Sequence, residues 1–173
     1  MRNILSDVKI AELLQDPKPL LKKQVEKLKT KFVAENKSRV SKLSVVSAGN
    51  MKFEITARGD ARPDKAHKFS VILGYTWKGD PINLIRCNGP HGPHTNTIER
   101  ALGAGVVEIP RDTYHIHFAT ERYQRVSEET DAEFYAEPTT EYDSLEGAVE
   151  YMCDHFGFYR ADDSYPKLHP LFP

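Results

Sequence analysis

Four of the seven histidines fall between residues 91 and 117, where their spacing could support catalysis or metal binding. Two of them, His115 and His117, flank an isoleucine in the segment Tyr-His-Ile-His-Phe at 114–118. In a strand, successive side chains point to opposite faces, so the two imidazoles would share the face opposite the apolar residues. We therefore expect His115 and His117 on the non-core face, about 6 to 7 Å apart along the strand.

One chemistry for this pair is metal-free acid–base catalysis on a phosphodiester. Imidazoles titrate near neutral pH, and a positioned proton donor or acceptor contributes about 10²–10⁴ in rate. On this hypothesis His115 and His117 act as base and acid, and His94 positions the substrate or supplies a second acid or base. Arg86 or Arg122 would stabilise the developing negative charge. RNA is the natural substrate, because its 2′-hydroxyl supplies an internal nucleophile.

A second chemistry is metal binding by the same histidines. A Gly- and Pro-rich loop at 88–96 carries a His-x-x-His pair, and the strand carries His-x-His followed by a carboxylate. Zn²⁺ or Fe²⁺ would suit such a donor set, although the acid–base hypothesis needs no cofactor. The candidate ligands are His91, His94, His115, His117 and Glu121. The His-x-His and Glu spacing resembles half of a cupin metal motif.

A third hypothesis is a noncatalytic binding module. Residues 1–49 carry a net charge of +6 and residues 119–173 a net charge of −9, although the whole chain has a net charge of only −1. Such segregation indicates either a basic surface for an anionic or protein partner, or two ends that pack together and neutralise each other. The imidazoles would then bind an anion or hold the loop by hydrogen bonds.

The elements that must position these residues begin with two helices. A short helix starts at Ser6 or Asp7 and ends before Pro17, because proline disfavours helical geometry in the residue before it. A second helix is expected from near Pro19, with lysines on its exposed surface. Its apolar residues recur at spacings of four, three and four: Leu21, Val25, Leu28 and Phe32.

From about residue 41 the hydrophobic period changes from 3.6 to 2, which predicts antiparallel strands. The expected strands lie near 43–46 and 53–56, over 69–77 and 82–87, and at 114–118. A short loop at 78–80 predicts a hairpin. In a meander, the face that carries the two histidines would also collect Lys52, Thr56, Arg58, Lys68 and Arg86.

A third helix is predicted near the end of the chain. Asp143 and Ser144 precede Leu145 and Glu146 with the spacing of a capping box, and Gly157 ends the helix. The acidic segment 128–143 is expected to be a surface connection. The order of elements predicts an α+β fold, in which two N-terminal helices and one C-terminal helix pack on one face of an antiparallel sheet meander.

Composition predicts one globular domain over residues 1–173, since 39% of its 173 residues are hydrophobic and 28% charged. We divide it into a helical arm at 1–38, the sheet and C-terminal helix at 41–158, and a tail at 159–173. Apolar runs are too short for a membrane span or a signal peptide, so we expect no membrane partner and a cytoplasmic location. The two cysteines, Cys87 and Cys153, are too far apart for a metal knuckle.

The segments Asn-Gly-Pro-His-Gly-Pro-His-Thr-Asn (88–96) and Tyr-His-Ile-His-Phe-Ala-Thr-Glu-Arg-Tyr-Gln (114–124) resemble a bacterial family of small domains of unknown function. The resemblance covers about residues 50 to 158 and implies no established activity. Two helices followed by a meander are also similar in layout to RelE- and barnase-like ribonuclease toxins. That similarity implies an endoribonuclease of a toxin–antitoxin pair, with RNA and a cognate antitoxin as partners.

Overall fold

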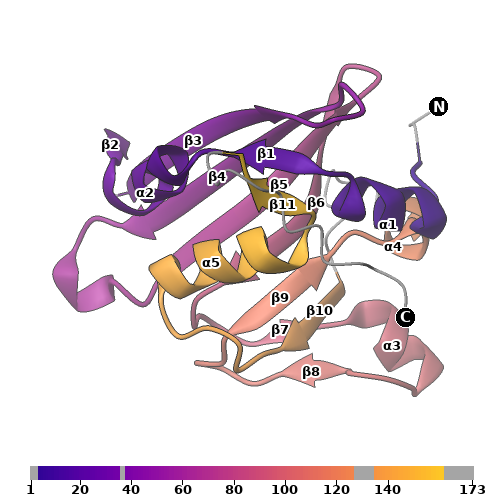
Figure 1. Ribbon diagram of the computed structural model, residues 1–173. Coiled ribbons are helices and arrows are strands. Elements are labelled where there is room, and N and C mark those ends of the chain that lie inside the picture. The colour runs from indigo at the N-terminus through magenta and orange to yellow at the C-terminus, as the bar shows by residue number, and fades with distance from the viewer. Residues whose placement is uncertain (1–3, 36–37, 127–134, 162–173) are drawn as a thin grey trace.

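The computed structural model describes residues 4–35, 38–126 and 135–161, and its centre is a seven-stranded antiparallel sheet (Figure 1). The strands lie in the order β10–β9–β6–β5–β4–β3–β2. They are β2 (Val33–Glu35), β3 (Ser38–Val46), β4 (Lys52–Asp60), β5 (Phe69–Trp77), β6 (Asp80–Asn88), β9 (His115–Phe118) and β10 (Tyr135–Pro138). The predicted α+β class with an antiparallel meander is confirmed.

The hairpin between β5 and β6 follows the sequence pattern closely. Lys78 and Gly79 have φ values of 51° and 94°, the left-handed geometry that suits the twist of a two-residue hairpin. On β5 the residues at alternate positions Phe69, Val71 and Leu73 are buried, as predicted for the core face. The register of this strand therefore puts the intervening side chains on the opposite face of the sheet.

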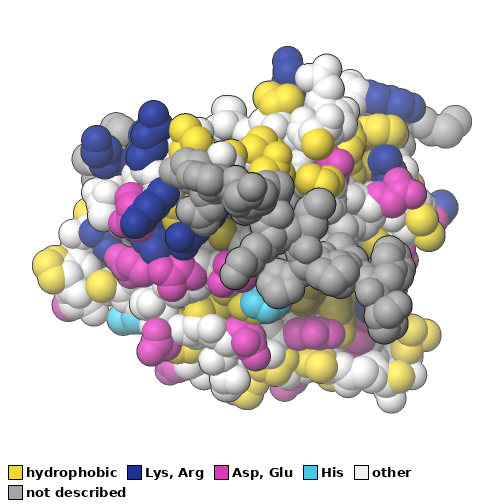
Figure 2. Space-filling view, in the orientation of Figure 1, with side chains coloured by type: hydrophobic (Ala, Val, Ile, Leu, Met, Phe, Trp, Pro, Cys, Tyr) yellow, Lys and Arg dark blue, Asp and Glu magenta, His cyan; other side chains and the backbone are white. Residues whose placement is uncertain are grey.

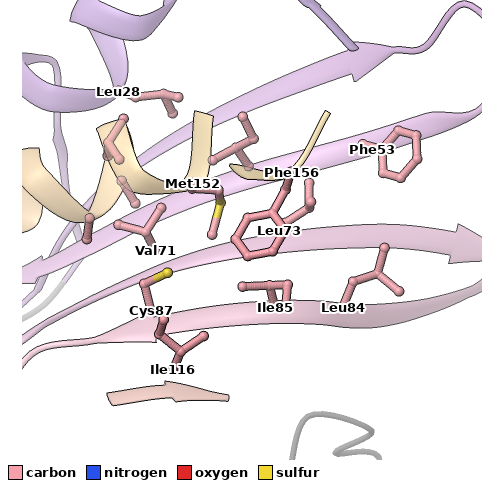
Figure 3. Close-up of a cluster of buried hydrophobic side chains, with 14 of the residues drawn as sticks. Leu28, Phe53, Val71, Leu73, Leu84, Ile85, Cys87, Ile116, Met152 and Phe156 are labelled. Atoms are coloured by element: carbon pink, nitrogen blue, oxygen red, sulfur yellow. The ribbon is translucent and has the colours of Figure 1, made fainter. Parts of the chain in front are cut away.

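Three helices contribute to the core on one face of the sheet: α1 (Asp7–Gln15), α2 (Lys22–Thr30) and α5 (Leu145–His155). Ser6 caps α1 by accepting a hydrogen bond from the backbone N–H of Lys9, and Ser144 caps α5 in the same way. Figure 3 shows side chains of α2 and α5 facing those of the strands. The labelled residues are Leu28, Phe53, Val71, Leu73, Leu84, Ile85, Cys87, Ile116, Met152 and Phe156.

The two ends of the described chain are joined by a parallel pair of short strands, β1 (Lys18–Leu20) and β11 (Phe158–Arg160). This pairing corrects the predicted start of the second helix, which begins at Lys22 because Pro19 belongs to β1. Gly157 permits the close approach of the two segments. A Cβ atom there would lie 2.6 Å from the carbonyl oxygen of Asp16, and its φ of +74° also disfavours other residues.

The charge segregation is partly neutralised within the molecule. Lys29 of α2 forms an ion pair with Glu150 of α5, with Nζ and Oε1 2.6 Å apart. Figure 2 shows Lys and Arg side chains over α2 beside Asp and Glu side chains over α5. The basic and acidic ends therefore pack against each other at this point, as one of the two interpretations of the charge pattern expected.

Other predicted boundaries differ from the structure. β3 begins at Ser38, before the expected change of period at residue 41. The acidic segment 128–143 is more than a surface connection, because residues 135–138 form the edge strand β10; residues 127–134 lie outside the described residues. The other short elements of the described residues are the 3-10 helix η1 (Pro63–Lys65), β7 (His94–Thr95), α3 (Thr97–Leu102), β8 (Glu108–Ile109) and α4 (Glu121–Val126). None of the described helices is long and apolar enough to cross a membrane.

Lys18 joins the C-terminal ends of two helices. Its buried Nζ lies 2.8 to 3.1 Å from the carbonyl oxygens of Leu13, Leu14, Asp16 and Phe156. The last carbonyls of a helix have no partner within the helix, and a cation there also interacts favourably with the helix dipole. One ammonium group thus satisfies the ends of both α1 and α5.

We predict that Lys18→Met lowers the free energy of unfolding by at least about 3 kcal/mol, because it leaves several buried carbonyl oxygens without a donor. Urea denaturation followed by circular dichroism measures the change. Lys23→Met removes the same charge from an exposed position on α2 and should change stability by less than about 0.5 kcal/mol. Equal losses in the two variants would contradict the role of Lys18.

Candidate functional site

The pairing of β6 with β9 aligns the polar side chains of two strands. Asn88 lies opposite His115, and Arg86 lies opposite His117. On the other side of β6, Asn88 lies opposite Ser70 of β5. Residues opposite each other in a sheet share a face and have neighbouring Cβ atoms. The register therefore forms a polar patch on the face of the sheet opposite α1, α2 and α5.

The two strand histidines point as the alternation predicted, but they are not open to solvent. Ile116 between them is buried in the core beside Cys87 of β6 (Figure 3). His115 is only 1% exposed and His117 8% exposed. The expectation of an open imidazole pair is wrong, because residues 89–114, between β6 and β9, fold back against this face. We call these residues the covering segment.

Four imidazoles meet where this covering segment lies over β9, two from the segment and two from the strand. The ring centroid of His115 lies 4.5 Å from that of His91, 5.0 Å from that of His117 and 6.3 Å from that of His94. The rings of His94 and His117 are 4.7 Å apart. The structure thus brings together the loop pair and the strand pair that the sequence separates by more than twenty residues. We call His91, His94, His115 and His117 the histidine cluster.

Backbone carbonyls orient two of these rings. His115 Nδ1 lies 2.8 Å from the carbonyl oxygen of Thr113, and His91 Nδ1 lies 3.1 Å from that of Gly92. A carbonyl oxygen only accepts, so both rings carry their proton on Nδ1 and present the lone pair of Nε2. The side-chain amide of Asn88 lies 3.4 Å from each Nε2. This orientation is the one in which metal-binding histidines are commonly held.

Burial disfavours the protonated form of both rings, as the direction of their pKa shifts shows. It lowers the pKa of His115 to about 4, an effect that the hydrogen bond to Thr113 opposes and that positive charge on His91 or His94 would increase. Burial also lowers the pKa of His91, and the nearby charges of Arg86 and Lys68 act in the same direction. A neutral imidazole is the form that binds metal and the form that acts as a base.

Three members of the histidine cluster could hold one metal ion. One ring nitrogen from each of His91, His115 and His117 lies within 4.8 Å of the other two. Ligand nitrogens about 2.0–2.1 Å from a central Zn²⁺ lie closer together than 4.8 Å, so the rings would move toward one another on binding the ion. Three imidazoles also leave coordination positions open for water or substrate.

The fourth member, His94, is directed toward Asn96. Its Nε2 lies 3.2 Å from Oδ1 of Asn96, which also accepts from the backbone N–H of Ala136. The Asn96 amide nitrogen donates to the carbonyl oxygens of Val106 and Ala136 at 2.7 Å. Asn96 is fully buried, and these bonds fasten the β7–α3–β8 segment to the edge strand β10 (Figure 1). The cover over His115 and His117 is therefore a fixed part of the fold.

Gly89 determines how the chain leaves β6 toward His91. A Cβ atom at this position would lie 2.0 Å from the carbonyl oxygen of His67 and 2.9 Å from the ring of Phe69. Only glycine allows so close an approach of the backbone. The glycine of the loop motif therefore has a steric reason, and it sets the path that returns His91 to the cluster.

A cavity of about 320 Å³ adjoins the cluster at His91. Three cationic side chains that the sequence placed on this face line it: Arg58, Lys68 and Arg86. Asn88 lines it as well and so contacts both the cavity and the cluster. Two other residues expected on this face, Thr56 and Lys52, are not among the lining residues. Thr56 lies next to Ile72 on β5, and Lys52 lies at the start of β4.

Two candidate residues are occupied elsewhere. Arg122 forms an ion pair with Glu99 of α3 and lies over the ring of Tyr135. Glu121 binds Arg125, with Oε1 3.0 Å from Nε, and is not in the three-histidine group. Neither residue lines the cavity. The sequence reasoning missed Asn88 and Asn96, although both lie in the loop motif that it singled out.

Comparison of the chain with protein-family models, curated proteins and solved structures found no match. The resemblance to a bacterial family and the similarity in layout to ribonuclease toxins stay predictions.

We predict that the metal-free protein loses stability as the pH falls from 7 to 5. The folded-state pKa of His115, about 4, lies below its ordinary value of 6.5, so the unfolded chain binds a proton that the folded protein excludes. Stability from this group is complete above pH 6.5 and is lost as the pH falls toward 4, with about 2 kcal/mol lost by pH 5. Urea denaturation at both pH values measures it.

His115→Gln should reduce this pH dependence, whereas His155→Gln, at an exposed position on α5, should retain it. An unchanged pH dependence in His115→Gln would show that burial of this imidazole is not its source. The measurement compares differences between two pH values, so a uniform loss of stability in either variant does not affect it.

Proposed function

We propose that this protein is a metal-dependent hydrolase whose ion is held by His91, His115 and His117. The observation that supports this proposal is the convergence of three imidazole nitrogens within 4.8 Å, with two of the rings oriented by backbone carbonyls. Zinc fits best, since it prefers nitrogen donors and accepts four ligands. Iron, the other metal considered from the sequence, binds imidazole as well.

Each residue around the site has a role that its contacts suggest. Thr113 and Gly92 orient the rings of His115 and His91 through their carbonyl oxygens and would thereby present the Nε2 lone pairs to an ion. When bound, the ion lowers the pKa of a coordinated water and polarises a substrate oxygen. Asn88, which lies beside both Nε2 atoms and lines the cavity, would orient the substrate.

The purified protein should contain close to one zinc ion per chain by mass spectrometry of metals. His115→Ala and His117→Ala should each weaken zinc binding by at least about a hundredfold, since even the loss of an outer hydrogen bond to a ligand costs 10–100-fold. Competition with a chromophoric chelator gives the affinities. His67→Gln, at an exposed site outside the cluster, and His94→Gln should retain the ion. Zinc-free protein that binds none on addition would refute the proposed centre.

A second candidate is a metal-independent endoribonuclease, and the register of Arg86 opposite His117 favours it. A guanidinium beside an imidazole is the arrangement that charge stabilisation and proton transfer at a phosphodiester require. This protein would act in the cytoplasm on RNA, as the toxin of a toxin–antitoxin pair with a cognate antitoxin as its partner. The burial of His115 favours a base over an acid, so the acid would have to be another member of the cluster.

The two candidates differ in their response to a chelator. A metal-independent nuclease should cleave an oligoribonucleotide in excess chelator and leave the DNA analogue intact, because DNA lacks the 2′-hydroxyl. His117→Ala should then lower the rate by at least about a hundredfold and relieve any growth arrest on expression. RNA that stays intact both with chelator and with added zinc would exclude this candidate.

A further inference from the structure

The cavity beside the histidine cluster has a strongly cationic wall. Arg58 comes from β4, Lys68 immediately precedes β5, and Arg86 comes from β6, so three adjacent strands each supply one charge. Among the described lining residues Asp60 is the one carboxylate, and Arg62 binds both of its oxygens at 2.6 and 2.8 Å. The lining therefore favours an anion with more than one negative charge.

The neutral lining groups fit the same class of ligand. Ser70 and Asn88 lie opposite each other on β5 and β6, and both line the cavity with a hydroxyl and an amide that can donate hydrogen bonds. Guanidinium groups bind phosphate oxygens through two parallel hydrogen bonds. A phosphate monoester carries close to two negative charges at pH 7, whereas a carboxylate or a phosphodiester carries one. A volume of about 320 Å³ lies at the small end of ligand cavities.

We infer that this cavity binds the phosphoryl group of a small phosphate monoester and presents it to the histidine cluster. His91 belongs to both the cavity and the three-nitrogen group, so a phosphoryl group held by Arg58, Lys68 and Arg86 lies next to the proposed centre. This inference rests on the proposed hydrolase. In the reaction, a water oxygen bonds to phosphorus, the ester P–O bond breaks with its electron pair on the leaving oxygen, and that oxygen takes a proton from the water.

The test is isothermal titration of metal-free, chelator-treated protein with inorganic phosphate and with acetate at low ionic strength. Phosphate should bind at least tenfold more tightly than acetate. Lys68→Met and Arg86→Met should each weaken phosphate binding at least tenfold. Lys42→Met is the matched control, because Lys42 is exposed on the same face of the sheet, pairs with Glu54 and lies outside the cavity; it should leave the affinity within twofold.

Several results would overturn the inference: no phosphate binding, equal binding of acetate, or equal weakening by Lys42→Met and Lys68→Met. Tighter binding of an oligoribonucleotide without terminal phosphates would replace the monoester by RNA. If Arg86→Met does not fold, Lys68→Met alone tests the inference, because Lys68 is exposed and its substitution should not prevent folding. Because the protein is metal-free here, a phosphate result does not depend on the zinc measurement, and the two proposals can fail separately.

Discussion

The histidine cluster depends on one register, the pairing of β6 with β9. This pairing sets Asn88 beside His115 and Arg86 beside His117 on the face away from the helices. A slip of β9 by one residue would turn His115 and His117 toward the apolar core, while Asn88 and Arg86 would stay in place through the pairing of β6 with β5. Tyr142 reinforces the register from the core side, because its hydroxyl donates to the carbonyl oxygen of His115 at 2.8 Å and lies 3.3 Å from that of Asn88.

The covering segment changes what the register alone would produce. Without it, two imidazoles would lie on an open sheet face, where they could exchange protons with solvent. With the covering segment in place, His115 is buried and neutral. The rings of His91 and His94, which belong to that segment, complete the cluster. The same burial that leaves His115 without a proton to donate near neutral pH leaves its ring in the form that binds metal, which supports the proposed metal centre over the metal-free hypothesis that the sequence placed first.

The sequence predicted the features that depend on local pattern. Alternation in β5 and β9, the hairpin at Lys78 and Gly79, and the cap of α1 each follow from a few neighbouring residues. The predicted capping box of α5 is wrong in detail, because Ser144 caps this helix by accepting from the backbone N–H of Gly147, and Glu146 lies one position too early to complete the box. Burial of the histidines could not be predicted, because it depends on hydrogen bonds from Asn96 to a strand forty residues away. The ion pair of Arg122 with Glu99 could not be predicted either, since the two residues are far apart in the sequence and no local spacing indicates the contact.

A purely structural role for the cluster explains its geometry less well than a ligand does. Buried imidazoles that only stabilise a fold normally bond through both nitrogens, because an unsatisfied buried polar atom costs about 1–3 kcal/mol. The buried His115 bonds well through Nδ1, but its Nε2 lies 3.4 Å from the side-chain amide of Asn88, beyond the usual 2.9–3.0 Å, and that amide lies equally far from Nε2 of the exposed His91. The lone pair of His115 is thus held firmly in orientation and only weakly satisfied. A metal ion between these nitrogens and His117 would supply the stronger partner that the carbonyl-fixed rings are already turned to accept.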